Sequence, residues 1–157
     1  FGNARVVIRG HSDPTKTLVD MLKAGMREGS IKQTGTSGNY SYFLNGKPLD
    51  LQQIALLQGM IDQGMFSGGT PDPKVTMQAA LNLSKKRAEA VRAAMLKFAQ
   101  SEDVTIDQSQ ITPVGAGISD AVIAKPKNLE EAKQNMRVEF RIVKVEAEAI
   151  QSSDFDF

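Results

Sequence analysis

The chain of 157 residues contains no cysteine, no tryptophan and only one histidine, His11. Without cysteine there can be no disulfide, zinc ribbon or catalytic thiol, and one histidine cannot build a multi-histidine metal site. The sequence gives no sign of a nucleophilic serine partnered with His11. We therefore expect no metal site, no cofactor and no enzymatic activity.

The sequence also lacks an excess of charge and a long apolar run. Because 19 Lys and Arg residues balance 18 Asp and Glu residues, we expect no basic surface for nucleic acid. No apolar run approaches the ~20 residues that cross a bilayer, so this segment should not insert into a membrane. The chain begins at Phe1 without a signal-peptide pattern. We expect a processed or excised piece whose targeting segment lies upstream.

What the sequence does contain is the composition of a globular domain. Hydrophobic residues make up 41% and charged residues 24%, which excludes a disordered or collagen-like chain. The length suits one domain with a single core. We interpret residues 1–145 as that domain and the acidic residues 146–157 as a weakly ordered tail.

The first third of the chain predicts a strand, a helix and a hairpin. Residues 4–10 alternate β-branched and charged side chains, which predicts a strand with Val6 and Ile8 on one face. Asp13 followed by proline is typical of a helix start, which predicts a helix over 14–28. Glycines and aromatic residues over 29–48 then favour a hairpin-like excursion.

The middle of the chain predicts two more helices. The first is capped by Asp50 and ends near Gly64, before a loop rich in glycine and proline at 67–73. The second is the strongest in the sequence, and its core face consists of Met77, Leu81, Ser84, Ala88, Val91, Met95 and Phe98. Arg87 lies about 60° from the centre of that face, on the same flank as Ala80 and Leu83.

The last third predicts the remaining strands. One covers 111–114 and runs into a glycine turn, and the other covers 136–145. In the latter, apolar residues including Phe140 and Ile142 alternate with charged ones, which predicts one buried and one polar face. The order of these elements predicts an α/β fold class.

Four motifs in order resemble a known family. They are Gly10-His11-Ser12-Asp13 after a strand, Leu83-Ser84-Lys85-Lys86-Arg87-Ala88 on the long helix, Gly115-Ala116-Gly117, and Asn135-Met136-Arg137-Val138-Glu139 on the final strand. Together they resemble the OmpA-like peptidoglycan-binding domain of bacterial envelope proteins. The resemblance covers residues 4–13 and about 80–145. It implies an α+β sandwich in which a mixed sheet carries helices on one face.

The resemblance implies non-covalent binding of the peptidoglycan stem peptide through diaminopimelate. Such binding would anchor an envelope protein to the cell wall in the bacterial periplasm. The family's roles fall on Asp13 for the ligand ammonium and on Arg87 for the ligand carboxylate. Neighbouring motif residues complete the candidate ligand-binding set, which is His11, Ser12, Asp13, Arg87, Asn135 and Arg137.

The chemistry of the residues agrees with that assignment. An amino-acid head group is a zwitterion, so Asp13 can accept from its ammonium while Arg87 holds its carboxylate with two donors. Simpler interpretations remain open for each residue alone. Asp13 is also a good helix cap, and Arg87 could pair with a local carboxylate such as Glu89.

The sequence departs from the family at several positions. The usual asparagine before the helix motif is Ala80, the first arginine of the last motif is Met136, and a usual proline is Ala121. The family's opening strand and first helix do not precede Ala4.

Residues 14–79 form an insertion beside the expected pocket. The insertion could form a lid, supply the polar group that Ala80 does not offer the ligand, or dock a partner through Tyr40, Tyr42 and Phe43. The alternative function is therefore a protein-interaction module in which residues 29–66 bind a protein partner.

Overall fold

The computed structural model describes residues 4–144, and the mixed α/β fold class predicted from the sequence is confirmed. In chain order, the elements are β1 Ala4–Gly10, α1 Thr15–Glu28, β2 Ile31–Thr36, β3 Asn39–Leu44, β4 Lys47–Pro48, α2 Ile54–Asp62, α3 Pro73–Ser101, a 3-10 turn Gln108–Gln110, β5 Ile111–Gly115, α4 Leu129–Asn135 and β6 Val138–Lys144. The tail predicted over 146–157 lies outside the described residues.

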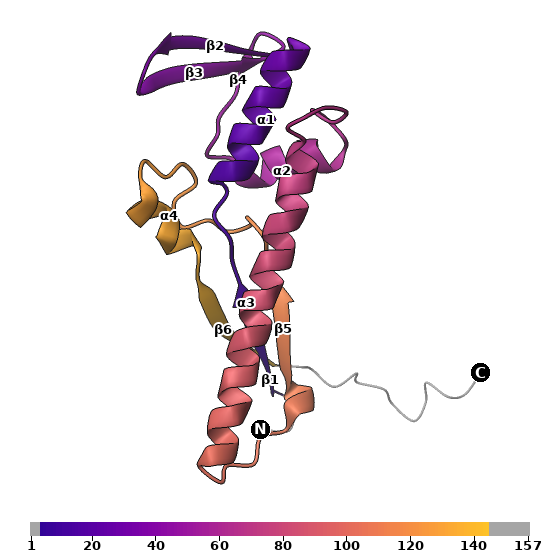
Figure 1. Cartoon of the computed structure of the whole chain (residues 1–157), viewed down its shortest axis with the longest axis vertical. Helices are drawn as coiled ribbons and strands as arrows, with labels where there is room; N and C mark the ends of the chain where they lie inside the picture. Colours follow the sequence, from indigo (N-terminus) through magenta and orange to yellow (C-terminus); the bar gives the residue numbers. More distant parts are fainter. Residues whose placement is uncertain (1–3, 145–157) are drawn as a thin grey trace, which may run out of the picture.

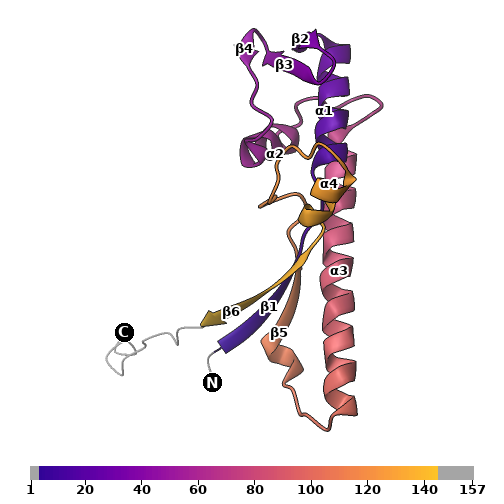
Figure 2. The same cartoon turned by 90° about the vertical axis from the view of Figure 1, so that its left-hand side faces the viewer.

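The long helix α3 organises the fold (Figures 1 and 2). The sheet β5-β1-β6 lies beside one half of α3, and α1 lies beside the other half. Strand β1 is parallel to β5 and antiparallel to β6, so the sheet is mixed as predicted. Asp72 starts α3 by accepting from the Lys74 N–H at 2.9 Å, with Pro73 at the first helical position.

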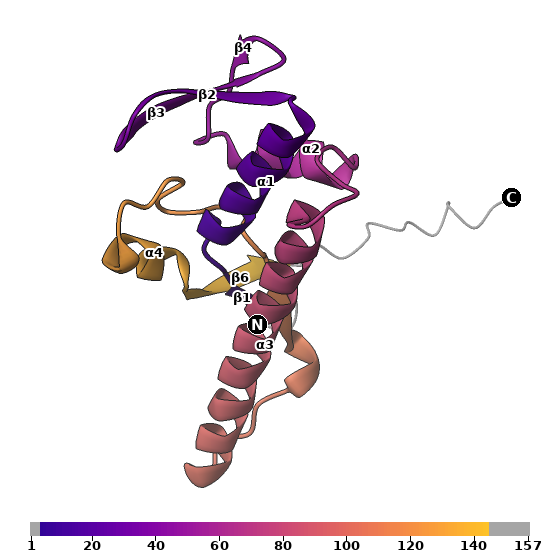
Figure 3. The same cartoon turned by 45° about the horizontal axis from the view of Figure 1, so that its top comes forward.

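The predicted hairpin forms a separate sheet, β2-β3-β4, at the end of the molecule away from the mixed sheet (Figure 3). Its tight turn joins Thr36 to Asn39, which face each other across the strands. The following helix differs from its prediction at the start. Asp50 accepts from the Gln52 N–H within a turn, and α2 begins only at Ile54.

The buried side chains form two hydrophobic clusters, where a single core was expected. One lies between β1, β5 and α3 and is centred on Ile8, Ala88 and Ile111. The other is built mainly from the predicted insertion: Leu18, Met21, Leu22, Ala24, Ile31, Leu51, Ile54, Leu57, Ile61 and Phe66, with Ile118 from after β5. The insertion therefore buries apolar area of its own.

The core face predicted for α3 is buried only in its middle. Ser84 and Ala88 are fully buried, whereas Phe98 is 66% exposed and Leu81 is 39% exposed. Near the end of the helix, Ala99 is buried in place of Phe98. The prediction for Phe98 was therefore wrong.

The buried face predicted for the last strand was also wrong. Phe140 and Ile142 are 56% and 79% exposed. They pair with Ile8 and Val6, so they lie on the face of the sheet that packs on α3. They are exposed because helix α3 packs mainly on β1 and β5. No other helix of residues 4–144 packs against β6 to a comparable extent.

Two glycines let the strands approach α3 closely. A Cβ atom added at Gly10 would overlap the Ser84 carbonyl oxygen. At Gly115 it would lie 2.8 Å from the Lys85 backbone nitrogen. Real Cβ atoms cannot occupy such positions, so only glycine allows this contact between sheet and helix.

Replacing Gly10 should therefore destabilise the protein. In Gly10→Ala the new methyl group meets helix backbone, which cannot move aside, so we expect the free energy of unfolding to fall by at least about 1–3 kcal/mol. Chemical denaturation measures this value.

Gly59→Ala is the matched control for that experiment. Gly59 lies inside α2, and nothing lies within 4 Å of its added Cβ. Its replacement should be neutral or stabilise the protein by about 0.5–1 kcal/mol. A Gly10→Ala variant as stable as the parent chain would contradict the close packing.

Candidate ligand-binding site

Backbone hydrogen bonds hold the turn after β1 against the residues that follow β5 and those that precede β6. The N–H of His11 donates to the Arg137 carbonyl at 2.8 Å, and the N–H of Ser12 donates to the Gly117 carbonyl at 2.7 Å. The Gly117 N–H in turn donates to the buried Ser84 hydroxyl on α3 at 2.9 Å. Residues of all four sequence motifs therefore meet at this turn.

Asp13 is oriented from two sides. One carboxylate oxygen accepts from the Thr15 N–H at 2.9 Å, and the other accepts from the Asn135 side-chain amide at 2.8 Å. Helix α1 begins at Thr15, one residue later than predicted, and Asp13 still satisfies that first N–H. Asp13 remains half-buried, so its carboxylate is both fixed and accessible.

Asn135 is a support for Asp13 and is itself fully buried. Its amide oxygen accepts from the Ile123 N–H at 3.0 Å, and its amide nitrogen donates to the Ile123 carbonyl at 2.8 Å. Both the oxygen and the nitrogen of this amide therefore have hydrogen-bond partners within the protein, which fixes its orientation.

Arg87 reaches the same turn from α3. Its Nη1 donates to the His11 carbonyl at 2.9 Å and to the Ser12 hydroxyl at 3.2 Å. The Ser12 hydroxyl donates onward to the Ala80 carbonyl at 2.9 Å, further toward the N-terminal end of α3. Glu89 was the local alternative as a partner for Arg87. Its carboxylate oxygen lies 4.0 Å from the Lys85 ammonium nitrogen instead.

Asp13 and Arg87 line one hollow of about 280 Å³. Its wall on α3 includes Ala79 and four residues, Thr76, Ala80, Leu83 and Arg87, whose spacing of four, three and four places them on one helix face. Among residues 4–144, no ion pair includes Asp13 or Arg87. The hollow therefore presents the Asp13 carboxylate and the Arg87 guanidinium without an ion pair between them, while the third charged residue of its wall, Lys16, pairs with Asp20.

This arrangement suits a small zwitterion. The Asp13 carboxylate can accept from an ammonium group, and the guanidinium of Arg87 can donate to a carboxylate through the nitrogens that its bonds to the turn leave unused. Because both groups are already held by protein hydrogen bonds, little side-chain freedom would be lost on binding.

The structure separates the six candidate residues into two groups. Ser12, Asp13 and Arg87 line the hollow. His11, Asn135 and Arg137 do not line it, and His11 and Asn135 are fully buried. Their positions favour a supporting role.

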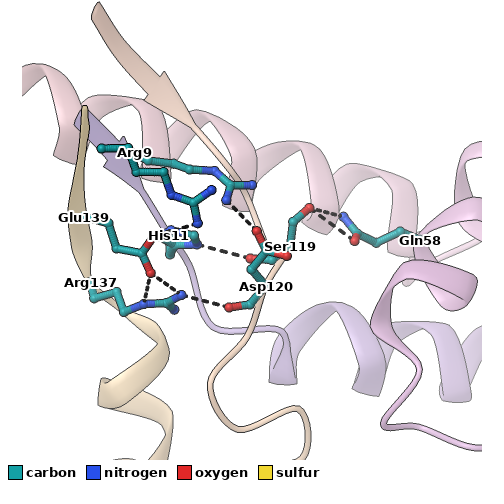
Figure 4. Close-up of polar contacts among 8 residues, drawn as sticks. Arg9, His11, Gln58, Ser119, Asp120, Arg137 and Glu139 are labelled. Carbon is teal, nitrogen blue, oxygen red and sulfur yellow. Dashed lines mark hydrogen bonds and ion pairs between the residues drawn. The ribbon is translucent and has the colours of Figure 1, made fainter. Parts of the chain in front are cut away.

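His11 and Arg137 belong to a polar cluster behind the turn (Figure 4). The Nδ1 of the His11 ring lies 3.1 Å from the Ser119 carbonyl, and its Nε2 lies 3.5 Å from a Glu139 carboxylate oxygen. Arg137 donates to Glu139 at 2.9 Å and to the Asp120 carbonyl at 2.9 Å. This cluster ties the loop after β5 to the beginning of β6.

Glu139 is the charged centre of this cluster. The hydrogen bonds from Arg137 hold its pKa at about 2, below the ordinary value of 4.5, although partial burial opposes the shift. Arg141 contributes a further hydrogen bond, and the charges of Arg137 and His11 act in the same direction. The carboxylate is therefore ionised at any ordinary pH.

Sequence reasoning did not identify three polar residues that line the hollow. They are Lys16 and Thr17 in the first turn of α1 and Thr76 on α3. The signal for Thr76 was its spacing from Ala80 and Arg87 on one helix face. All three belong to the predicted insertion, so the insertion forms part of the wall.

Comparisons with known proteins identify no relative: no family model, no curated protein and no solved structure matches the chain. Within residues 4–144, no three metal-binding side chains gather as a cluster. In the same part of the chain, no helix has the length and apolar character needed to span a membrane.

Glu139 should make stability depend on pH. A carboxyl group whose pKa is lowered in the folded state stabilises that state at pH values above its ordinary pKa. This contribution is lost as the pH falls from about 5 toward 2. In Glu139→Gln we expect lower stability at pH 7 and a shallower loss between pH 5 and pH 2. Denaturant unfolding at several pH values measures both.

Glu130→Gln provides the control for this pH series. The Glu130 side chain is 80% exposed and pairs with Lys133 on the surface of α4, a kind of pair that contributes little to stability. Its loss of stability with acid should match that of the parent chain. An equally steep loss in Glu139→Gln would show that another group causes the pH dependence.

Proposed function

We propose that this protein binds the stem peptide of peptidoglycan non-covalently, through the zwitterionic head group of diaminopimelate. Binding would anchor a bacterial envelope protein to the cell wall, which places the domain in the periplasm. Asp13 accepts from the ligand ammonium, and Arg87 donates to the ligand carboxylate. The protein acts in this proposal as a binding module and not as an enzyme.

One observation carries the proposal: two opposite charges, far apart in the sequence, line the same hollow, and neither has an ion-pair partner among residues 4–144. Two half-buried opposite charges that converge on one hollow favour a ligand that carries both charges. The motif resemblance supports the choice of an amino-acid head group from the cell wall.

The expected affinity for one stem peptide is modest. Each charge-assisted hydrogen bond contributes about 1.5–3 kcal/mol, and association itself costs several kcal/mol. The dissociation constant should therefore lie near the millimolar range. Repeated stem peptides on the wall would raise the effective strength of attachment.

The insertion supports this function by completing the hollow. The family's asparagine is Ala80 here, whose side chain cannot form a hydrogen bond. Lys16, Thr17 and Thr76 bring polar side chains to the same hollow. We infer that they take the place of the asparagine in binding the ligand.

A second candidate function is a protein-interaction module that uses the hairpin. A hollow of about 320 Å³ lies on β3 and the chain that follows it, with Tyr40, Tyr42 and Phe43 among its lining residues. Tyr40 is 40% exposed, and aromatic residues of this kind are enriched in protein interfaces.

Substitution of the two charged residues tests the first proposal. In Asp13→Asn the ligand ammonium loses its counter-charge, and in Arg87→Lys the carboxylate loses the paired donors. We expect each change to weaken binding to diaminopimelate about 10-fold or more. Titration followed by backbone amide shifts, together with co-sedimentation with purified sacculi, measures the effect.

Lys86→Gln and Tyr40→Ser are the controls. Lys86 is exposed on α3 next to Arg87 but outside the hollow, and Tyr40 lies on the hairpin. Both variants should bind as the parent chain does, and thermal unfolding should show that all variants are folded. Full binding by the folded Asp13→Asn and Arg87→Lys variants would refute the proposal.

A further inference from the structure

Strand β6 forms one edge of the mixed sheet. Within residues 4–144, β1 pairs with one side of β6, and no strand pairs with the other side. The opposite edge strand, β5, contains Pro113, which has no N–H to offer a further strand, whereas β6 contains neither proline nor glycine. Proteins usually block a long edge that could pair with another chain, so the open edge of β6 favours an extended partner.

The backbone groups at this edge follow from the pairing with β1. The His11 N–H donates to the Arg137 carbonyl at 2.8 Å, just before β6 begins. Antiparallel strands exchange hydrogen bonds at every second residue pair, so the odd-numbered residues of β6 point their N–H and C=O groups toward β1. The even-numbered residues, with Phe140 in the middle, therefore point these groups toward the open edge.

One face of β6 is apolar and becomes uncovered along the strand. Val138 packs partly against the cluster centred on Ile8, but Phe140 and Ile142 on the same face are 56% and 79% exposed. Figure 2 shows that the end of β6 diverges from α3. Exposed apolar side chains beside an open strand edge are typical of a surface that another protein covers.

The other face of β6 is charged and complementary to itself. Glu139 and Arg141 lie on it, with side chains that are 30% and 52% exposed and 3.0 Å apart. If two copies of β6 pair antiparallel about Phe140, each Glu139 lies opposite Arg141 of the second copy. Val138 then lies opposite Ile142. The adjacent registers, centred on Glu139 or on Arg141, would instead place like charges opposite each other.

We propose that two copies of this chain pair through their β6 edges, antiparallel and centred on Phe140. They form one six-stranded sheet, with three strands from each copy. A second copy fits this edge because its apolar and charged positions match their own counterparts, and a two-fold axis makes every such contact twice. Both α3 helices then lie on the same face of the sheet, with the Phe140 and Ile142 side chains between them.

The concentration dependence of the mass tests the proposal on the full chain. In sedimentation equilibrium from low micromolar to millimolar concentration, we expect the apparent mass to rise from that of one chain toward that of two. The backbone N–H groups of Phe140 and Ile142 should gain protection against hydrogen exchange over the same range, because they donate to the second copy.

Reversal of one charge tests the pairing of the side chains. In Arg141→Glu, a carboxylate faces Glu139 of the second copy at both ends of the pairing, so we expect association to weaken about 10-fold or more. Lys32→Glu is the matched control, because it changes the net charge equally on β2, an exposed edge strand of the other sheet. It should associate as the parent chain does, and thermal unfolding verifies that both variants are folded.

A single introduced cysteine tests the register, since the chain contains no cysteine. In the proposed pairing the two Phe140 Cα atoms lie about 5.5 Å apart, a separation that a disulfide can bridge. Phe140→Cys should therefore cross-link into a dimer under mild oxidation. In Ile142→Cys the two cysteines lie roughly 14 Å apart, so this variant should not cross-link.

Three results would overturn the proposal. The first is the mass of one chain at every concentration; protection of the Phe140 and Ile142 amides under those conditions would show that the same chain covers its own edge. The others are unchanged association of folded Arg141→Glu and equal cross-linking of the two cysteine variants. The proposed function stands in each case, because none of residues 138–142 lines the hollow that contains Asp13 and Arg87.

Discussion

The close approach of two strands to α3 is the constraint on which the rest of the structure depends. Gly10 and Gly115 bring the ends of β1 and β5 against the helix backbone. The turn after Gly10 then meets α3 directly, where Arg87 donates to the His11 carbonyl. An aspartate and an arginine from distant parts of the sequence therefore share a hollow because the backbones beneath them are in contact.

The sequence predicted those parts of the molecule that local pattern determines. Alternation predicted β1, helical spacing predicted α3, and the four motifs predicted that Asp13 and Arg87 would lie near each other. Alternation could not predict the exposure of Phe140 and Ile142, because it shows that a strand has two kinds of face but not which neighbour covers them. The walls of the hollow escaped prediction because they depend on how α1 packs beside α3.

The insertion is an integral part of the molecule. Ile118, which follows the glycine turn near the site, packs into the cluster formed by α1 and α2. The first turn of α1 lines the hollow that contains Asp13 and Arg87, and the end of the same helix leads into the hairpin. A ligand in this hollow and any molecule that contacts the hairpin would therefore act on the same helix.

The hydrogen bond from Asn135 to Asp13 spans 122 positions of the chain. During synthesis, Asp13 leaves the ribosome long before the residue that orients it. The strand and helix on either side of the turn have local patterns of their own. The geometry of the candidate site, in contrast, forms only when the C-terminal part of the chain is present. A nascent or truncated product that stops before residue 135 would thus contain both charged groups and still lack a finished site.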